Sequence, residues 1–378
     1  MTPNSLVAPA GRVAPRVSRW KALGARLVFL LTASYGLLYF SYKFLIPWSG
    51  TNDFQHYYWM YRTPLNFHVA PSPFVLRQVS AMLTYLVWKA HIYYPNEIWF
   101  VDSRYDQHVF FAALFTNWVC LVLAALTAGV LSEEMLGRRS FLCATMAGLI
   151  CLLSFHSQFV VISGITEGVS WLMLSLAFLA YLRRIEWAVV VLLILAILQR
   201  EALLVAMGCI AALDLFRGRA GDREFRYRVM LYAAAGFAVY LAFRRMVPGN
   251  DHQIHAVSML ASLRRVRVTR AMVFESFLNQ NVVMIAVAAG VLQRRREGAI
   301  LFRHRWLPIF LVTFGCLEFL ALCAGLDVDI GRIAGITIPL FAASAAADLM
   351  RLESSGGLAS PTGFEPVLPP GTGGVLGH

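Results

Sequence analysis

Residues 109–131 read VFFAALFTNWVCLVLAALTAGVL, an unbroken run of 23 residues without a charged side chain. A hydrocarbon core about 30 Å thick requires roughly 20 apolar residues in a helix, so this run predicts a membrane-spanning helix. The rest of the chain is similar: 58% of its 378 residues are hydrophobic, only 14% are charged, and its mean hydropathy is +0.62. Soluble domains of this length do not have such a composition, so the sequence predicts an all-α, polytopic transmembrane helix bundle.

Further apolar segments bring the expected number of spans to about ten. The ten segments are approximately 27–47, 109–131, 141–155, 159–182, 186–198, 202–216, 229–247, 275–292, 306–326 and 332–349. Three of them, 141–155, 186–198 and 202–216, are too short to cross a bilayer of normal thickness, which indicates short, broken helices. The last two flank Gln199-Arg200-Glu201. Charges at that depth require surrounding protein or water, so we expect a cavity open to the outer side.

The basic residues predict the orientation of the chain. With the N-terminus inside, 20 of the 33 Lys and Arg residues fall on the cytoplasmic side, which also places the C-terminus there. Arginine outnumbers lysine thirty to three, which is a hint of a GC-rich bacterial source. The sequence therefore predicts a multi-pass protein of the cell inner membrane, and its net charge of +12 is assigned to these loops rather than to nucleic-acid binding.

This orientation divides the chain into three parts. A basic cytoplasmic N-terminus covers 1–26, and the transmembrane domain covers 27–349 with outer loops at 48–108 and 248–274. The tail at 350–378 is rich in Gly, Pro and Ser and lacks helical periodicity, so it is predicted to be disordered in the cytoplasm.

Acidic residues outside the cytoplasmic loops gather on the outer side. Asp53 follows the first span, Glu201 lies in the short hairpin, and Asp327 and Asp329 precede Arg332 between the last two spans. A carboxylate near a low-dielectric boundary can act as a base, because burial raises its pKa. The alternative is structural, since interfacial acids often cap helices or pair with an arginine.

The outer loop 48–108 contains a further amphipathic stretch at 74–94, in which apolar residues are interrupted by Arg77 and other polar residues. It predicts a helix lying in the membrane interface, either as a roof over a substrate groove or as a surface anchor. His56 lies three residues from Asp53. Two residues do not make a metal site by themselves, so no metal ligands are assigned and a divalent metal cofactor is left open.

Loop 248–274 carries a basic run, Arg264-Arg265-x-Arg267-x-x-Arg270, on the side that should be poor in positive charge. Arginine forks bind phosphate through two parallel hydrogen bonds, so the run could hold a lipid phosphate or pyrophosphate. The alternative is a solvated amphipathic segment resting on anionic headgroups.

With these residues in view, the chain resembles the GT-C superfamily of integral-membrane glycosyltransferases, which use polyprenyl-phosphate-linked sugars. The resemblance covers about 27–349, and each motif is short, so their order and common side support it. The motifs are Asn52-Asp53 after the first span, Pro73-Phe74-Val75-Leu76-Arg77, Thr166-Glu167 at the start of a span, Leu198-Gln199-Arg200-Glu201, and Asp329-Ile330-Gly331-Arg332 followed by Pro339.

The resemblance implies that Asp53 is the general base on an acceptor hydroxyl and that the anomeric configuration inverts. An anionic leaving group requires cations nearby. The implied donor and phosphate site comprises Arg77, Arg200, Glu201, Arg264, Arg265, Asp327, Asp329 and Arg332, with His56 and Glu167 as further candidates. The first motif has one acid rather than a doubled one, and the chain has no large soluble outer domain. Metal dependence and the acceptor, whether glycan, lipid or protein, therefore stay open.

Other functions also fit these features. A lipid-linked sugar flippase or transporter would explain the spans, the broken helices and the charges at depth. A polysaccharide polymerase or ligase shares lipid-phosphate chemistry and would explain the outer arginine run. A scaffold without chemistry is the remaining alternative.

Overall fold

The structure is a computed structural model that describes residues 19–44, 53–70, 74–94, 105–155, 157, 166–217, 223–247, 270, 280–297, 306–323 and 333–355. Within these ranges the chain forms twelve α-helices and two short 3-10 helices, and no strand. The predicted all-α fold is therefore confirmed for the described residues.

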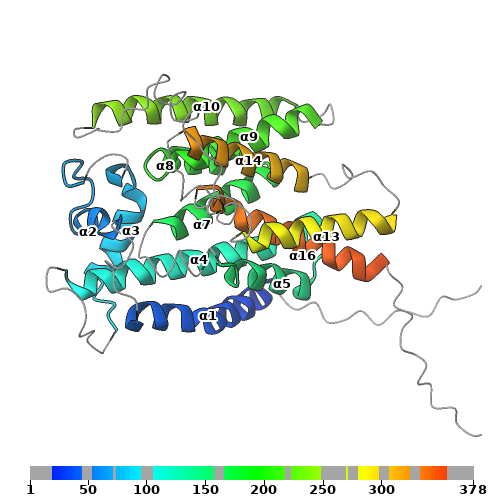
Figure 1. Cartoon of the computed structure of the whole chain (residues 1–378), viewed down its shortest axis with the longest axis horizontal. Coiled ribbons are helices and arrows are strands. Elements are labelled where there is room, and N and C mark those ends of the chain that lie inside the picture. Colours follow the sequence, from blue (N-terminus) through cyan, green and yellow to red (C-terminus); the bar gives the residue numbers. More distant parts are fainter. Residues whose placement is uncertain are drawn as a thin grey trace, which may run out of the picture.

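The helices are α1 (Arg19–Phe44), α2 (Asp53–Arg62), α3 (Gln78–Lys89), α4 (Gln107–Leu136), α5 (Phe141–Leu152), α7 (Glu167–Leu182), α8 (Glu186–Ile197), α9 (Glu201–Arg217), α10 (Arg223–Met246), α13 (Asn281–Glu297), α14 (Leu307–Cys323) and α16 (Ile338–Ser355). The 3-10 helices η1 (Phe74–Leu76) and η5 (Gly335–Thr337) precede α3 and α16. In Figure 1 the longer helices run mainly along one direction, and α2 and α3 lie together at one end of the bundle. We call this the α2/α3 end.

Four helical segments in the described part are long and apolar enough to cross a membrane: Trp20–Lys43, Gln107–Leu136, Arg223–Met246 and Gly335–Glu353. Five shorter apolar helices, Phe141–Leu152, Glu167–Leu182, Glu186–Ile197, Asn281–Gln293 and Leu307–Cys323, accompany them. These helices make the protein compatible with a location in a membrane. Both α5 and α8 have 12 residues, so these two segments are as short as the sequence predicted.

Several helices extend beyond the apolar segments that predicted them. Helix α1 begins at Arg19 rather than near residue 27, and α16 continues to Ser355 beyond residue 349. The reason is that hydropathy marks only the part of a helix suited to lipid, whereas Arg, Lys, Glu and Ala continue a helix well in water. Residues 356–378 of the predicted tail lie outside the described residues.

Helix α2 was not predicted. Its sequence DFQHYYWMYR mixes polar and aromatic residues and contains no Leu, Ile, Val or Ala, so a search for apolar runs passes over it. The helix nevertheless buries Phe54, Tyr57 and Tyr61 completely or almost completely, and Phe54 packs edge-on against Phe110 of α4. Aromatic burial therefore fixes this part of the outer loop on the bundle.

Helix α3 confirms that 74–94 contains a helix. Its polar residues Gln78, Ser80 and Thr84 are buried, whereas Leu83 and Leu86 are exposed. This arrangement is the reverse of a soluble helix, because the protein side of α3 holds hydrogen-bonding groups and the outer side is apolar. The buried polar side chains make α3 one wall of the site described below.

Helix α4 is the centre of the bundle and contacts α1, α5, α7 and α16. Its contact with α7 is close because Gly168 has no side chain. A Cβ atom on Gly168 would lie 2.6 Å from the backbone oxygen of Asn117, and the amide of Gly168 already donates to the Asn117 Oδ1 at 3.1 Å. The atom that such a Cβ would meet belongs to the backbone of α4, which cannot move aside as a side chain can. The first turn of α7 is therefore fixed in place by α4.

Gly168→Ala is therefore expected to destabilise the protein by about 1–3 kcal/mol, because α7 must move away from α4 to accept one methyl group. The measurement is the free energy of unfolding in mixed micelles of SDS and a mild detergent. Gly315→Ala in α14 is the matched control, since nothing lies within 4 Å of its added Cβ atom and alanine is the better helix former. Equal stability of the two variants would contradict the close packing of α4 and α7.

Candidate functional site

A buried polar cluster lies at the α2/α3 end, where α2, α3, α7, α10 and the α8–α9 turn meet. Its members are buried, except for the partly buried Glu201, and they carry charges or hydrogen-bonding groups. They are Tyr57, Arg77, Ser80, Thr166, Glu167, Ser170, Gln199, Arg200, Glu201 and Tyr240. Burial of such groups is unfavourable unless they are paired, so their contacts show how the cluster is organised.

Gln199 connects three elements of the cluster. Its Nε2 donates to the backbone oxygen of Thr166 at 3.0 Å and contacts the hydroxyls of Ser80 at 2.8 Å and Ser170 at 3.1 Å. Its Oε1 accepts from the backbone amide of Ser80 at 3.0 Å. The backbone oxygen of Leu198 also accepts from the amide of Val79 at 3.1 Å. The α8–α9 turn is thereby held against both α3 and α7.

Arg200 and Glu167 form an ion pair inside this frame. The Arg200 Nη1 lies 3.0 Å from the Glu167 Oε1, and the two side chains are only 4% and 0% exposed. Two charges removed from water in this way are stable only together, because either one alone would be a buried, uncompensated charge. The pair joins the α8–α9 turn to the first residue of α7.

Arg77 lies immediately before α3 and holds two further elements. Its Nη1 donates a hydrogen bond to the hydroxyl of Tyr57 from α2. The same nitrogen donates to the Thr166 Oγ1 at 3.2 Å. Its guanidinium carbon lies 5.4 Å from the ring centre of Tyr57, within the range of a cation–π contact. A guanidinium has five donors in a planar fork, so Arg77 can contact α2 and Thr166 at the same time.

Glu201 and α10 complete the cluster. The carboxylate of Glu201 lies within electrostatic range of both Arg77 and Arg200 and beside the hydroxyl of Tyr240. Arg244, one turn further along α10, acts on the same tyrosine. Among the described residues of the cluster, two guanidinium groups, Arg77 and Arg200, lie with two carboxylates, Glu167 and Glu201, and Arg244 adds a third guanidinium at its edge. Guanidinium groups are well suited to bind an anion such as phosphate.

The structure brings together four of the residues predicted for the site: Arg77, Glu167, Arg200 and Glu201. Glu167 and Arg200 form an ion pair with each other, a pairing that the sequence did not predict. His56 lies close by but is stacked on the ring of Phe74, with 4.6 Å between ring centres. The remaining predicted site residues Arg264, Arg265, Asp327, Asp329 and Arg332 lie outside the described residues.

Asp53 is the first residue of α2 and lies one helical turn before Tyr57. Because the hydroxyl of Tyr57 accepts a hydrogen bond from Arg77, the start of α2 is anchored next to the buried polar cluster. Among the residues that the structure describes, no group of three His, Cys, Asp or Glu residues could hold a metal ion.

Sequence patterns missed several members of the cluster. Ser80 and Ser170 are single polar residues in largely apolar helices, while Tyr57 and Tyr240 resemble ordinary interfacial aromatics. These residues could have been found by asking which polar side chains lie on the side of each helix that faces the rest of the bundle. That side is known only when the neighbours of the helix are known.

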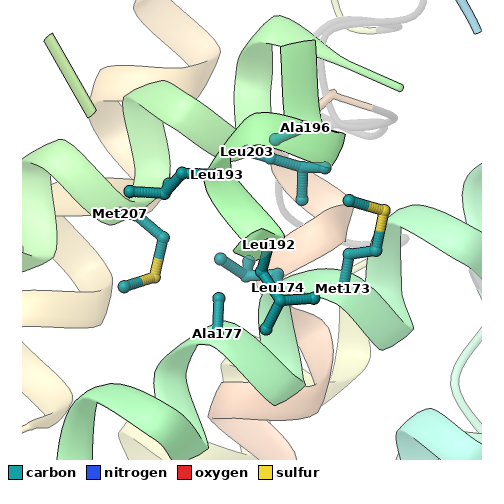
Figure 2. Close-up of a pocket in the computed structure, with 8 residues that line it drawn as sticks. All are labelled: Met173, Leu174, Ala177, Leu192, Leu193, Ala196, Leu203 and Met207. Atoms are coloured by element: carbon teal, nitrogen blue, oxygen red, sulfur yellow. The ribbon is translucent and has the colours of Figure 1, made fainter. Parts of the chain in front are cut away.

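A small apolar pocket lies between α7, α8 and α9, beside the cluster. Figure 2 shows its lining, Met173, Leu174, Ala177, Leu192, Leu193, Ala196, Leu203 and Met207, which carries no polar side chain. Its volume of about 10 Å³ is at the lower limit for a single water molecule. The pocket is therefore a gap in the packing, lined by two flexible methionines, and it is too small to bind a sugar.

Fold and site together define an all-helical protein with several helices long enough to span a membrane and a buried cluster of charged and polar side chains at one end. The sequence matches no protein-family model, and it has no significant match among curated proteins or solved structures.

Proposed function

We propose that this protein is a membrane glycosyltransferase of the GT-C type. It moves a sugar from a polyprenyl-phosphate donor to an acceptor hydroxyl, with inversion of the anomeric configuration. The observation that supports this proposal is the buried polar cluster, which contains Arg77 and Arg200 and whose Tyr57 lies one helical turn from Asp53. We also propose that the chain crosses the membrane about ten times. The shorter helices then cross where protein and water surround their ends.

In the proposed reaction, the oxygen of the acceptor hydroxyl attacks the anomeric carbon of the sugar. Asp53 accepts the proton of that hydroxyl during the attack. The bond from that carbon to the phosphate oxygen breaks, and the electron pair leaves with the lipid phosphate. Arg77 and Arg200 stabilise the negative charge that builds up on the phosphate. One bond forms and one breaks on opposite faces of the sugar, so the configuration inverts.

The proposed location is the inner membrane of a bacterium, with the α2/α3 end on the extracytoplasmic side and both termini in the cytoplasm. Support comes from the turns that join α4 to α5 and α7 to α8. Each carries an arginine pair, Arg138-Arg139 and Arg183-Arg184, which the positive-inside rule places in the cytoplasm. The start of α7 and the α8–α9 turn then face outward, as does the cluster.

The test is to incorporate the full chain into proteoliposomes with radiolabelled polyprenyl-phosphate sugars and to follow both donor cleavage and donor movement. A glycosyltransferase releases polyprenyl phosphate and forms a labelled product with a supplied acceptor glycan or lipid. Movement of intact donor between leaflets without cleavage would identify a flippase instead. Stepwise growth of a long glycan on the lipid would identify a polymerase.

A further inference from the structure

A recess lies at the opposite end of the bundle from α2 and α3. Its volume is about 720 Å³, and it is bounded by the beginning of α1, the end of α4, the α4–α5 turn and the end of α7. Leu23, Val130 and Phe141 form apolar parts of its wall. The polar lining is rich in arginine. None of these residues belongs to the buried polar cluster, so the recess is a separate feature of the bundle.

The charges in the recess are only partly paired. Arg26 forms an ion pair with Glu133 at 2.7 Å, and Arg183 forms one with Glu134 at 2.7 Å. Two more arginines, Arg138 and Arg139, also line the recess. Both are exposed, and within the described part of the chain neither is in an ion pair. The lining therefore has two positive charges in excess.

The α4–α5 turn holds these two arginines at a defined place. Gly137 ends α4 in the left-handed conformation, with φ +75°, which favours glycine. Ser140 caps α5 by accepting from the amide of Cys143 at 3.1 Å, and its own amide donates to Glu133 at 3.1 Å. Arg138 and Arg139 are therefore presented by a short turn that is fixed at both ends.

Exposed apolar residues beside the recess are of the kind found at a membrane interface. Trp20 opens α1 and is 78% exposed, and Phe141 and Leu142 at the start of α5 are 54% and 59% exposed. Exposed tryptophans at helix ends are typical of the headgroup region, and adjoining apolar side chains suit acyl chains. A soluble anion would make no use of this apolar surface.

We propose that this recess binds an anionic phospholipid. The phosphodiester accepts hydrogen bonds from Arg138 and Arg139, and the acyl chains lie along Leu23 and Phe141 on the outside of α1 and α5. Basic recesses between helices on the cytoplasmic side are suited to such headgroups, and arginine forks match phosphate oxygens. This site is separate from sugar transfer, and only its cytoplasmic position rests on the proposed function.

The experiment measures cardiolipin binding to the purified full chain by native mass spectrometry, with phosphatidylcholine as the neutral reference lipid. The test variant is Arg138→Gln with Arg139→Gln. The matched control is Arg223→Gln with Arg295→Gln, which removes two exposed charges from the starts and ends of other helices at the same end. We expect the test variant to bind cardiolipin about tenfold more weakly and the control variant to bind it like the native chain.

A second variant, Ala22→Trp, keeps every charge but fills part of the recess, and it should also weaken binding of cardiolipin. Equal binding by the test and control variants would overturn the proposal. Displacement of cardiolipin by inorganic phosphate at comparable concentration would also overturn it, because the site would then recognise a soluble anion. Unchanged melting temperature of the lipid-free variants confirms that they are folded.

Discussion

Asp53→Asn should lower the rate of glycosyl transfer by about 100- to 10,000-fold, which is the usual contribution of a positioned general base. Asparagine has the shape of aspartate but cannot accept the proton of the acceptor hydroxyl. The measurement is release of polyprenyl phosphate from a radiolabelled donor under single-turnover conditions. Binding of the donor should change little, because the proposed cationic contacts come from Arg77 and Arg200.

Asp106→Asn is the matched control for this substitution. Asp106 caps α4 at the same end of the bundle by accepting from the amide of His108 at 2.8 Å. Asparagine caps helices about as well as aspartate, so the control should keep both stability and activity. If the folded Asp53→Asn variant transferred sugar at the native rate, Asp53 would have no part in the mechanism. If both variants lost activity equally, the effect would be one of local structure.

Arg200→Met should destabilise the protein by about 3–5 kcal/mol, because it removes the buried cation that pairs with the fully buried carboxylate of Glu167. Arg183→Met is the matched control, since it breaks an ion pair of similar length with Glu134 whose side chains are 31% and 42% exposed. An exposed pair contributes only about 0–1 kcal/mol. The measurement is the free energy of unfolding in mixed micelles, and similar losses in both variants would contradict the burial of the Arg200 pair.

Combining Arg200→Met with Glu167→Gln separates the structural from the functional role of the pair. Both buried charges are then gone, so much of the lost stability should return. If Arg200 stabilises the leaving phosphate, the double variant should remain folded and still transfer sugar at least about tenfold more slowly, which is the scale of one lost charge-assisted contact. A stable double variant with native activity would restrict Arg200 to holding α7 against the α8–α9 turn.

Apolar run length predicted the described helices well because it reflects the solvent around each segment. The short segments at 141–155 and 186–198 correspond to α5 and α8, and Gln199 and Arg200 lie between α8 and α9, with Glu201 as the first residue of α9. Helix α2 was missed because its stability comes from aromatic side chains packed against α4, and packing leaves no mark on hydropathy. Helix ends were misplaced because polar helix formers continue α1 and α16 beyond their apolar segments.

The sequence by itself determined the helical class, the compatibility with a membrane and the set of charged residues at the ends of the short helices. Each of these depends on local chain chemistry, that is, on the number of apolar residues and the position of the charges between them. The tertiary structure alone decided that Arg200 pairs with Glu167, that Tyr57 reaches Arg77, and that Gln199 joins three elements. These contacts join residues 20 to 119 positions apart, so only the packing of the helices could place them together.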